Sequence, residues 1–276
     1  MALSASGASD GVALSPIGRR FSERAAQGQA VLIPYITAGF PDPSATVEMM
    51  EAAADAGADV IELGIPFSDP LADGPTIQRS SFMAIQKGTT VDTVLDALRT
   101  FRERRDTPTV LFTYLNPVLR RGLGEFCREA AEAGADGLLL TDLPVGCDSG
   151  MEEQVKSAGL DWIRLLAPTT SRERVPLVAQ GGSGFLYYIS RTGVTGARTE
   201  LRSELVAEVA ALREAVTMPI AVGFGISTPE QARMVALAAD GVVVGSALIA
   251  QLEREGVAGA AAFLGALRQG MDEIDH

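Results

Sequence analysis

The stretch AGADVIELG, residues 56–64, decides the fold, and its pattern returns in AGADGLLLTD (133–142) and LAADGVVVGS (237–246). Each stretch ends an alanine-rich segment at small residues and then enters a run of aliphatic residues almost at once. A helix therefore leads directly into a buried strand at three distant places in the chain. Strands that alternate with helices form a parallel sheet, because each helical crossover returns the chain to the same edge.

The same alternation extends along the chain from residue 31 onward. Eight short apolar runs are the predicted strands: Val31–Ile36, Asp59–Leu63, Thr109–Tyr114, Gly137–Leu140, Trp162–Leu166, Gly184–Ile189, Ile220–Val222 and Gly241–Val244. Helices are predicted near 43–56, 91–104, 123–133, 148–158, 171–179, 199–215, 228–238 and 259–274, with an amphipathic helix at Ile17–Ala26 before the first strand. Eight such units in 276 residues predict the α/β class and a single (β/α)8 TIM barrel with an extra N-terminal helix.

Residues 1–15 are small and polar, and they are predicted to form a disordered tail before a barrel domain at 16–276. An open, doubly wound sheet is the alternative architecture. A dinucleotide-binding fold of that kind would carry G-x-G-x-x-G after its first strand, whereas residues 36–43 read ITAGFPDP. The barrel is therefore favoured.

Composition excludes several classes of function. Thirty-five acidic residues against 23 basic ones give a net charge of -12, which disfavours nucleic acid and anionic membranes as partners. No apolar run is long enough to cross a bilayer, and the N-terminus does not read as a signal peptide, so a cytoplasmic location is expected. Cys127 and Cys147 lack metal-ligand spacing and are expected to be reduced thiols.

Residues that usually carry catalysis are scarce. The only histidine is His276, and the only lysines, Lys87 and Lys156, are expected in helices. A His-ligated metal, a Ser-His-acid triad and a lysine Schiff base therefore lack their essential residue, and no metal site is expected. Any chemistry must depend on carboxylates.

The stretch ELGIPFSDPLADGPTIQ (62–78) supplies such carboxylates among residues typical of a core. Strand alternation places Glu62 on the face opposite Ile61 and Leu63, so it points into the mouth of the barrel if those two pack beneath the helices. Active sites of barrel enzymes lie at this end of the strands. The alternative is a buried acid paired with an arginine, and the arginines nearest to strand ends are Arg164 and Arg191.

The two aspartates of this stretch have a competing interpretation. Asp69 precedes a proline and Asp73 precedes a glycine, and both patterns are common in turns. Turn chemistry explains Asp69 adequately, whereas for Asp73 taken alone the two interpretations are balanced.

Glycine-bearing loops follow the last three predicted strands: SRTGVTGAR (190–198), GFGIS (223–227) and GSALI (245–249). Barrel enzymes commonly hold a phosphate in such loops together with the N-terminus of a short extra helix, for which Ser246–Leu252 is a candidate. Backbone N–H groups can bind a phosphate without a lysine. The alternative is that these glycines only shape turns, and GGSG (181–184), which precedes the sixth strand, is interpreted in that way.

These motifs together resemble the tryptophan synthase alpha chain family. The resemblance spans residues 17–270 and includes IPYITAGFPD (33–42), TYLNPV (113–118), TDLP (141–144), VGFGIS (222–227) and VVVGSALI (242–249). It implies a barrel lyase of L-tryptophan biosynthesis that reversibly cleaves indole-3-glycerol phosphate to indole and glyceraldehyde 3-phosphate. It also implies no cofactor in this chain and a pyridoxal-phosphate-bearing beta chain as partner, in an alpha-beta-beta-alpha tetramer through which indole passes in a tunnel.

The resemblance assigns roles to individual residues. It matches Glu62 and Asp73 to the two catalytic acids. The substrate pocket would be lined by Tyr35, Phe112, Tyr114, Thr141, Leu165, Tyr187 and Phe224. The phosphate would be bound at Thr195, Gly196, Gly225, Gly245 and Ser246. Tyr35 departs from the family, where phenylalanine is common at this position, and its hydroxyl needs a hydrogen-bond partner if it is buried.

A mechanism follows from these residues as a hypothesis. Glu62 would protonate the ring carbon and then accept a proton from the side-chain hydroxyl, which requires a pKa raised by apolar surroundings. Asp73 would accept the ring N–H as a carboxylate. Pro66 and Asp69 are the expected contacts with the beta chain. The alternatives are a free-standing lyase without a beta chain, a catalytically idle barrel that activates a partner, and an isomerase barrel of the same pathway.

Overall fold

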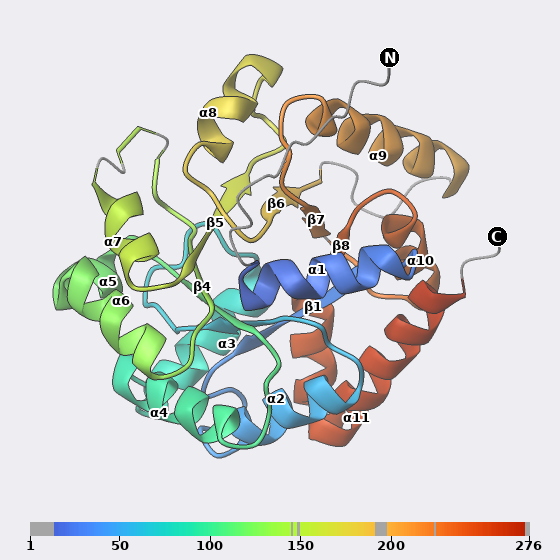
Figure 1. Ribbon diagram of the computed structural model, residues 1–276. Coiled ribbons are helices and arrows are strands. Elements are labelled where there is room, and N and C mark those ends of the chain that lie inside the picture. Colours follow the sequence, from blue (N-terminus) through green and yellow to red (C-terminus); the bar gives the residue numbers. More distant parts are fainter. Residues whose placement is uncertain (1–13, 145, 148–149, 191–197, 224, 274–276) are drawn as a thin grey trace, which may run out of the picture.

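The computed structural model describes residues 14–144, 146–147, 150–190, 198–223 and 225–273. Its eight strands are all parallel and close in sequence order into one barrel, with β8 hydrogen-bonded to β1 (Figure 1). They are β1 (Val31–Thr37), β2 (Ile61–Gly64), β3 (Thr109–Thr113), β4 (Gly137–Leu140), β5 (Asp161–Leu166), β6 (Leu186–Ile189), β7 (Ile220–Gly223) and β8 (Gly241–Val244). The predicted (β/α)8 barrel is confirmed, and the doubly wound alternative is wrong.

Helices surround this barrel (Figure 1). They are α1 (Pro16–Ala26), α2 (Ala45–Asp55), α3 (Pro75–Gln86), α4 (Val91–Arg102), α5 (Leu115–Arg121), α6 (Leu123–Glu132), α7 (Met151–Ser157), α8 (Val175–Ala179), α9 (Arg198–Arg213), α10 (Pro229–Ala236) and α11 (Ser246–Asp272). The predicted helix at 171–179 is a 3-10 turn, Arg172–Arg174, followed by α8. The two helices expected in the last part of the chain are joined within α11 across a non-helical residue, Gly256.

Two of these helices were not predicted, α3 and α5. Their sequences are short or begin inside a proline-rich loop, which obscured the helical periodicity. Lys156 lies in α7 as expected, whereas Lys87 is the residue that caps the C-terminus of α3. The expected tail lies mostly in residues 1–13, outside the described residues, and stays a prediction.

The core has two layers, one between strands and helices and one inside the barrel. Side chains of alternate strand residues fill the interior: Val31, Ile33, Val60, Val110, Leu139, Ile163, Ala221 and Val243. From α1, Ile17 and Phe21 join this inner cluster, and the Phe21 ring lies 5.5 Å from that of Phe185. The helix α1 therefore lies across the N-terminal end of the barrel (Figure 1), and its side chains fill that end of the interior.

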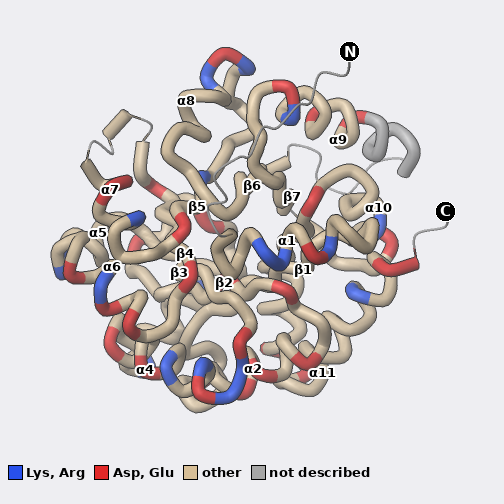
Figure 2. The backbone as a smooth tube through the Cα atoms, viewed as in Figure 1, with Lys and Arg blue, Asp and Glu red and all other residues tan. Residues whose placement is uncertain are grey.

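Charged residues gather on the helices and connections, while the strands are mostly uncharged (Figure 2). Basic side chains on this surface pair with acids of neighbouring helices, for example Arg104 with Glu51 and Arg105 with Asp55. Among the described helices, none has both the length and the apolarity needed to cross a bilayer. Cys127 and Cys147 are free thiols, as expected.

The aspartates of the three repeated joints have a shared structural role. Asp59 accepts a hydrogen bond from the Leu32 N–H at 2.9 Å. Asp136 and Asp240 bind the N–H groups of Thr109 and Ile220 in the same way, at 2.9 and 2.8 Å. Each aspartate precedes one strand and binds the beginning of the strand before it. The repeated motif therefore joins neighbouring strands at the closed end of the barrel.

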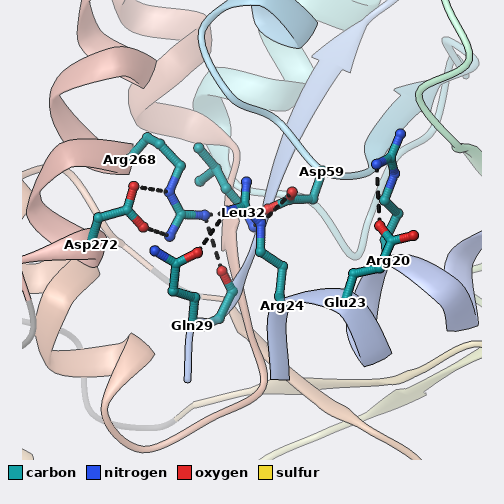
Figure 3. Close-up of polar contacts among 9 residues, drawn as sticks. Arg20, Glu23, Arg24, Gln29, Leu32, Asp59, Arg268 and Asp272 are labelled. Carbon is teal, nitrogen blue, oxygen red and sulfur yellow. Dashed lines mark hydrogen bonds and ion pairs between the residues drawn. The ribbon is translucent and has the colours of Figure 1, made fainter. Parts of the chain in front are cut away.

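Asp59 also forms ion pairs with two arginines, one of which, Arg268, is paired with Asp272 as well (Figure 3). Arg24 of α1 donates to Asp59 at 2.7 Å, and Arg268 of α11 lies 3.3 Å away. Arg268 is buried and donates to the Ala30 carbonyl at 3.0 Å as well. One carboxylate thus connects the N-terminal helix, the first two strands and the C-terminal helix.

Replacing Asp59 with asparagine is expected to destabilise the fold by about 2 kcal/mol, the usual magnitude for hydrogen bonds to a charged group. The amide oxygen can still accept the Leu32 N–H, but the charge between Arg24 and Arg268 is lost. Thermal unfolding followed by circular dichroism measures the change. Asp106→Asn is the matched control because that side chain is 94% exposed. Equal melting temperatures for the parent and Asp59→Asn would show that this carboxylate does not hold the helices.

Candidate active site

A cavity of about 420 Å³ lies at the C-terminal ends of the strands. It brings together most of the residues predicted from the sequence: Tyr35, Glu62, Asp73, Phe112, Thr141, Leu165, Tyr187, Gly225, Gly245 and Ser246. Tyr114 reaches the site through a hydrogen bond to Asp73. Thr195, Gly196 and Phe224 lie outside the described residues. The clustering supports a single site for all of the described candidates except Pro66 and Asp69.

Glu62 projects from β2 into this cavity. Its neighbours Ile61 and Leu63 pack in the outer core layer, so strand alternation turns Glu62 inward, as the sequence predicted. The side chain is 1% exposed, and neither carboxylate oxygen has a hydrogen-bond partner among the described residues. Burial raises the pKa of the Glu62 carboxyl from 4.5 to about 8. The group is therefore mostly protonated at neutral pH.

The alternative of an arginine partner for Glu62 is wrong for Arg164. That guanidinium lies over the Trp162 ring, 4.7 Å from its centroid, and donates to the Gln180 carbonyl at 3.1 Å. Arg191, the other arginine considered, lies outside the described residues.

Asp73 lies in the loop between β2 and α3 and is half-buried. The Tyr114 hydroxyl donates to Asp73 Oδ2 at 3.0 Å and accepts the Ala72 N–H at 3.0 Å, which fixes the carboxylate relative to the end of β3. Burial raises the pKa of Asp73 from 3.8 to about 6, while the Tyr114 hydrogen bond opposes that rise. Asp73 is therefore mostly ionised at neutral pH.

The two acids thus differ in protonation within one cavity. Within the described part of the chain Glu62 has no hydrogen-bond partner and is enclosed, whereas Asp73 has a hydroxyl donor and partial access to water. Such a difference allows one carboxyl group to give a proton while the other stabilises positive charge. No group of three or more His, Cys, Asp or Glu side chains able to hold a metal ion occurs among the described residues.

Aromatic rings form the walls between these acids. Tyr35 and Phe112 meet edge to face, with ring centroids 5.0 Å apart. A Cβ at Gly64 would lie 2.2 Å from the Tyr35 hydroxyl, and one at Gly223 would lie 2.5 Å from the Tyr187 hydroxyl. Glycine at these two strand ends therefore makes room for the tyrosines. A narrow cavity with aromatic walls suits a flat aromatic ligand.

The cavity also has features that can bind an anion. Gly223, Gly225 and Gly245 line it, and α11 begins beside it at Ser246. The first N–H groups of a helix have no acceptor within the helix, and its N-terminus carries partial positive charge. Because α11 supplies these donors from the backbone, an anion can be held here without a lysine.

Sequence reasoning missed part of the site. Ile77 of α3 lines the cavity, and Ser80 lies behind it, bonded to Thr37. Two signals in the sequence could have revealed α3. One is the proline at its first position, directly after Gly74. The other is the helical spacing of its buried residues, Ile77, Ser80, Ser81 and Ala84.

Pro66 and Asp69 lie on the same β2–α3 loop but are not brought into the cavity. Pro66 is half-buried and Asp69 is exposed. The neighbouring Leu71 is 89% exposed, which is unusual for a large apolar side chain. A contact of this loop with a partner chain stays a prediction.

Comparisons with known proteins agree with this geometry. A family model described as "Tryptophan synthase alpha chain" matches residues 21–272. The tryptophan synthase alpha chain of Geobacter sp. (strain M21) is 47% identical over 262 residues, covering 94% of this chain and 98% of that protein. The alpha chain of Burkholderia thailandensis is 48% identical over 264 residues, covering 94% and 97%.

Solved structures show the same relationship. Tryptophan synthase subunit alpha from Legionella pneumophila superposes with a TM-score of 0.87 at 40% identity, covering 95% of this chain and all of that one. A chain of tryptophan synthase from Mycobacterium tuberculosis superposes with a TM-score of 0.86 at 37% identity, covering 94% of this chain and 99% of that one. The match extends over nearly the whole length in sequence and in structure, and the chain belongs to the tryptophan synthase alpha chain family.

Proposed function

We propose that this chain is a carbon–carbon lyase that reversibly cleaves indole-3-glycerol phosphate to indole and glyceraldehyde 3-phosphate. The observation that carries the proposal is the pair Glu62 and Asp73, two acids of different protonation in one cavity that has aromatic walls and an anion-binding end. A substrate with a flat ring, a short polyol and a phosphate matches this cavity. The ring fits the aromatic walls, the polyol lies beside the acids, and the phosphate fits the anion-binding end. Family membership supports the same activity.

The proposed pose places each part of the substrate. The indole ring lies between the aromatic walls formed by Tyr35, Phe112 and Tyr187, with its N–H toward Asp73. The phosphate lies at the N-terminus of α11, near Gly225, Gly245 and Ser246. The same proposal includes three further pocket residues, Thr141, Leu165 and Phe224. It also includes two further phosphate-binding residues, Thr195 and Gly196. This pose leaves the ring carbon that bears the side chain facing Glu62.

The proposed chemistry uses Glu62 for two proton transfers, one to the substrate and one from it. Protonated Glu62 gives its proton to the ring carbon that bears the glycerol side chain, and positive charge develops on the ring nitrogen beside ionised Asp73. Glu62, now a carboxylate, accepts the proton of the adjacent side-chain hydroxyl. The carbon–carbon bond breaks, its electron pair restores the aromatic ring, and the hydroxyl carbon becomes the aldehyde. Glu62 ends the cycle protonated.

A direct assay tests the function. Indole released from indole-3-glycerol phosphate is measured by a coupled or chromatographic assay with the purified chain, alone and with a tryptophan synthase beta chain. We expect cleavage that depends on the phosphate group of the substrate. Absence of cleavage in both conditions would reject the lyase and favour a catalytically idle barrel that activates a partner. Full turnover by the chain alone, without stimulation, would favour a free-standing lyase.

We further propose a pyridoxal-phosphate-bearing beta chain as partner, in an alpha-beta-beta-alpha tetramer, with Pro66 and Asp69 in the contact. The support is the loop itself, which carries Asp73 at one end and exposes Leu71 beside the cavity. Binding energy at this loop would be coupled to ligand binding in the cavity. Titration calorimetry of the beta chain with and without a glycerol-phosphate ligand should give two affinities, and equal affinities would contradict the coupling.

The two raised pKa values predict a bell-shaped dependence of turnover on pH. Activity should fall below about pH 6, where Asp73 becomes protonated, and above about pH 8, where Glu62 loses its proton. The maximum is expected between these limits. Steady-state turnover measured from pH 5 to about pH 9.5 in buffers of constant ionic strength checks this. Activity that keeps rising above pH 9 would contradict Glu62 as the acid.

A further inference from the structure

The hydroxyl group of Tyr35 occupies a special place in the cavity. Tyr35 pairs with Glu62 in the register between β1 and β2. Its ring crosses β2, so that its hydroxyl lies over Gly64, where a Cβ would be 2.2 Å away. Residues two apart on a strand share a face, so this hydroxyl and the Glu62 side chain lie on the same side of β2. Both residues line the cavity.

A chain of buried hydroxyl groups leads away from Tyr35. Thr37 Oγ1 donates to the Tyr35 hydroxyl at 3.5 Å and lies 2.7 Å from Ser80 Oγ, with which it can exchange the donor role. Ser80 lies on α3 and donates to the Ile77 carbonyl at 2.9 Å. Thr37 and Ser80 are almost completely buried, so water does not compete for these bonds.

Each hydroxyl has one hydrogen, and this permits two arrangements of the chain. When Ser80 donates to Thr37 and Thr37 to Tyr35, the Tyr35 hydrogen is left to donate into the cavity. When Ser80 donates to Ile77 and Thr37 to Ser80, Tyr35 donates to Thr37 and its oxygen accepts from the cavity. Tyr35 can therefore act as a donor or as an acceptor toward a neighbour that changes its charge.

Several ionisable groups face Tyr35. They are Glu62 on β2, Asp73 on the β2–α3 loop, and Tyr114 at the end of β3, while Tyr187 faces it from β6. Asp73 already accepts a hydrogen bond from Tyr114, whereas both oxygens of Glu62 are unsatisfied among the described residues. Among these groups Glu62 is therefore the one whose carboxyl oxygens both lack a hydrogen-bond donor in the described part of the chain, and Tyr35 is its register partner on β1.

We propose that Tyr35 is a positioning residue for Glu62. The carboxylate form of Glu62 receives a hydrogen bond from the Tyr35 hydroxyl, and the chain formed by Thr37 and Ser80 sets whether that hydroxyl donates or accepts. The inference rests on the proposed function, in which Glu62 must exist in both protonation states during one cycle. With Glu62 protonated, the tyrosine oxygen accepts; with Glu62 ionised, the tyrosine donates. The chain thus stabilises the intermediate state in which the glutamate has given up its proton.

Titration of the Glu62 carboxyl in the free protein tests the proposal without any substrate. Carboxyl-labelled glutamate is introduced, the Glu62 carbon signal is assigned by its loss in Glu62→Gln, and its shift is followed from pH 5 to about pH 10.5 by nuclear magnetic resonance. In Tyr35→Phe the pKa of Glu62 is expected to rise by about one unit, because the charged form loses its donor; one unit corresponds to about 1.4 kcal/mol. Turnover at the pH optimum should fall about tenfold with little change in KM, because the ionised glutamate formed during the cycle is less stable, while the fall of turnover at high pH should move to higher pH with the pKa of Glu62.

Matched variants separate positioning from simple packing. Thr37→Val should raise the pKa of Glu62 in the same direction but by less, whereas Thr37→Ser, which keeps the hydroxyl, should restore the parental value. Tyr188→Phe is the control, because the Tyr188 hydroxyl bonds Glu208 in the outer layer, away from the cavity. It should leave the pKa of Glu62 unchanged.

Two results would overturn the proposal. One is an unchanged pKa of Glu62 in Tyr35→Phe, and the other is a shift confined to Asp73. A shift of the Glu62 pKa as expected, in a protein that does not cleave indole-3-glycerol phosphate, would instead reject the lyase function and leave the hydroxyl chain established.

Discussion

Turnover of indole-3-glycerol phosphate is expected to fall by 10²–10⁴-fold when Glu62 is replaced by glutamine, the usual contribution of a general acid–base group. Glutamine fills the same volume on β2 but can neither give nor accept the proton. Binding of a glycerol-phosphate ligand should survive, because the anion-binding end of the cavity is untouched. Single-turnover kinetics and ligand titration measure the two effects separately.

Stability provides the control for this variant. The pKa of Glu62 is raised in the folded protein, from 4.5 to about 8. The stability that protonated Glu62 contributes is complete below pH 4.5 and is lost as the pH rises through about 8. Glu62→Gln removes this dependence, so at pH 9 the variant should unfold at a higher temperature than the parent.

A more stable but inactive protein would locate the defect in chemistry rather than in folding. Glu103→Gln, on the exposed end of α4, is the matched substitution and should change neither property. Near-parental turnover in Glu62→Gln would exclude Glu62 as the proton donor.

Features of this protein were predictable from its sequence when they depend on residues that are close together in the chain. The barrel strands were found within a few residues because each is a short apolar run that follows a recurrent joint, and β8 matched its predicted bounds. Glu62 was placed correctly by alternation alone, since Ile61 and Leu63 needed apolar surroundings on the opposite face.

Features that depend on contacts between distant segments were not predictable in the same way. The hydroxyl chain joins Thr37 to Ser80, 43 residues apart in sequence, and α3 had not been predicted. The role of the aspartates in the repeated motif could be found only from the structure, because from the sequence Asp59 could have been an ordinary turn residue before a strand. Its bond to Leu32 crosses from one strand to the previous one and leaves no periodic trace in the sequence.

Asp73 was the residue for which sequence reasoning was balanced, because an aspartate before glycine is common in turns. The structure adds two facts that turn chemistry does not require. The side chain lines the cavity, and it accepts a hydrogen bond from Tyr114, which lies 41 residues away in sequence. A turn residue would more often bond its own backbone.

Replacing Asp73 with asparagine is therefore expected to lower turnover by about 10²–10³-fold, the magnitude found when a preorganised electrostatic group of an active site is removed. Asparagine keeps an oxygen that can accept from Tyr114 and from the indole N–H, so the loop geometry is preserved and only the charge is lost. Tyr114→Phe should cost less, about tenfold, because the carboxylate remains and only its orientation is loosened. Asp96→Asn on α4 is the surface control.

The pH dependence of turnover shows whether the lost charge of Asp73 causes the fall in turnover. In the parent the acid limb should follow the Asp73 pKa of about 6. In Tyr114→Phe this limb should move to higher pH, because the hydrogen bond that lowers the pKa of Asp73 is lost. In Asp73→Asn it should disappear, since no group remains to be protonated there, while the fall above about pH 8 from Glu62 persists. An acid limb unchanged in Asp73→Asn would assign it to another group and return Asp73 to a structural role in its loop.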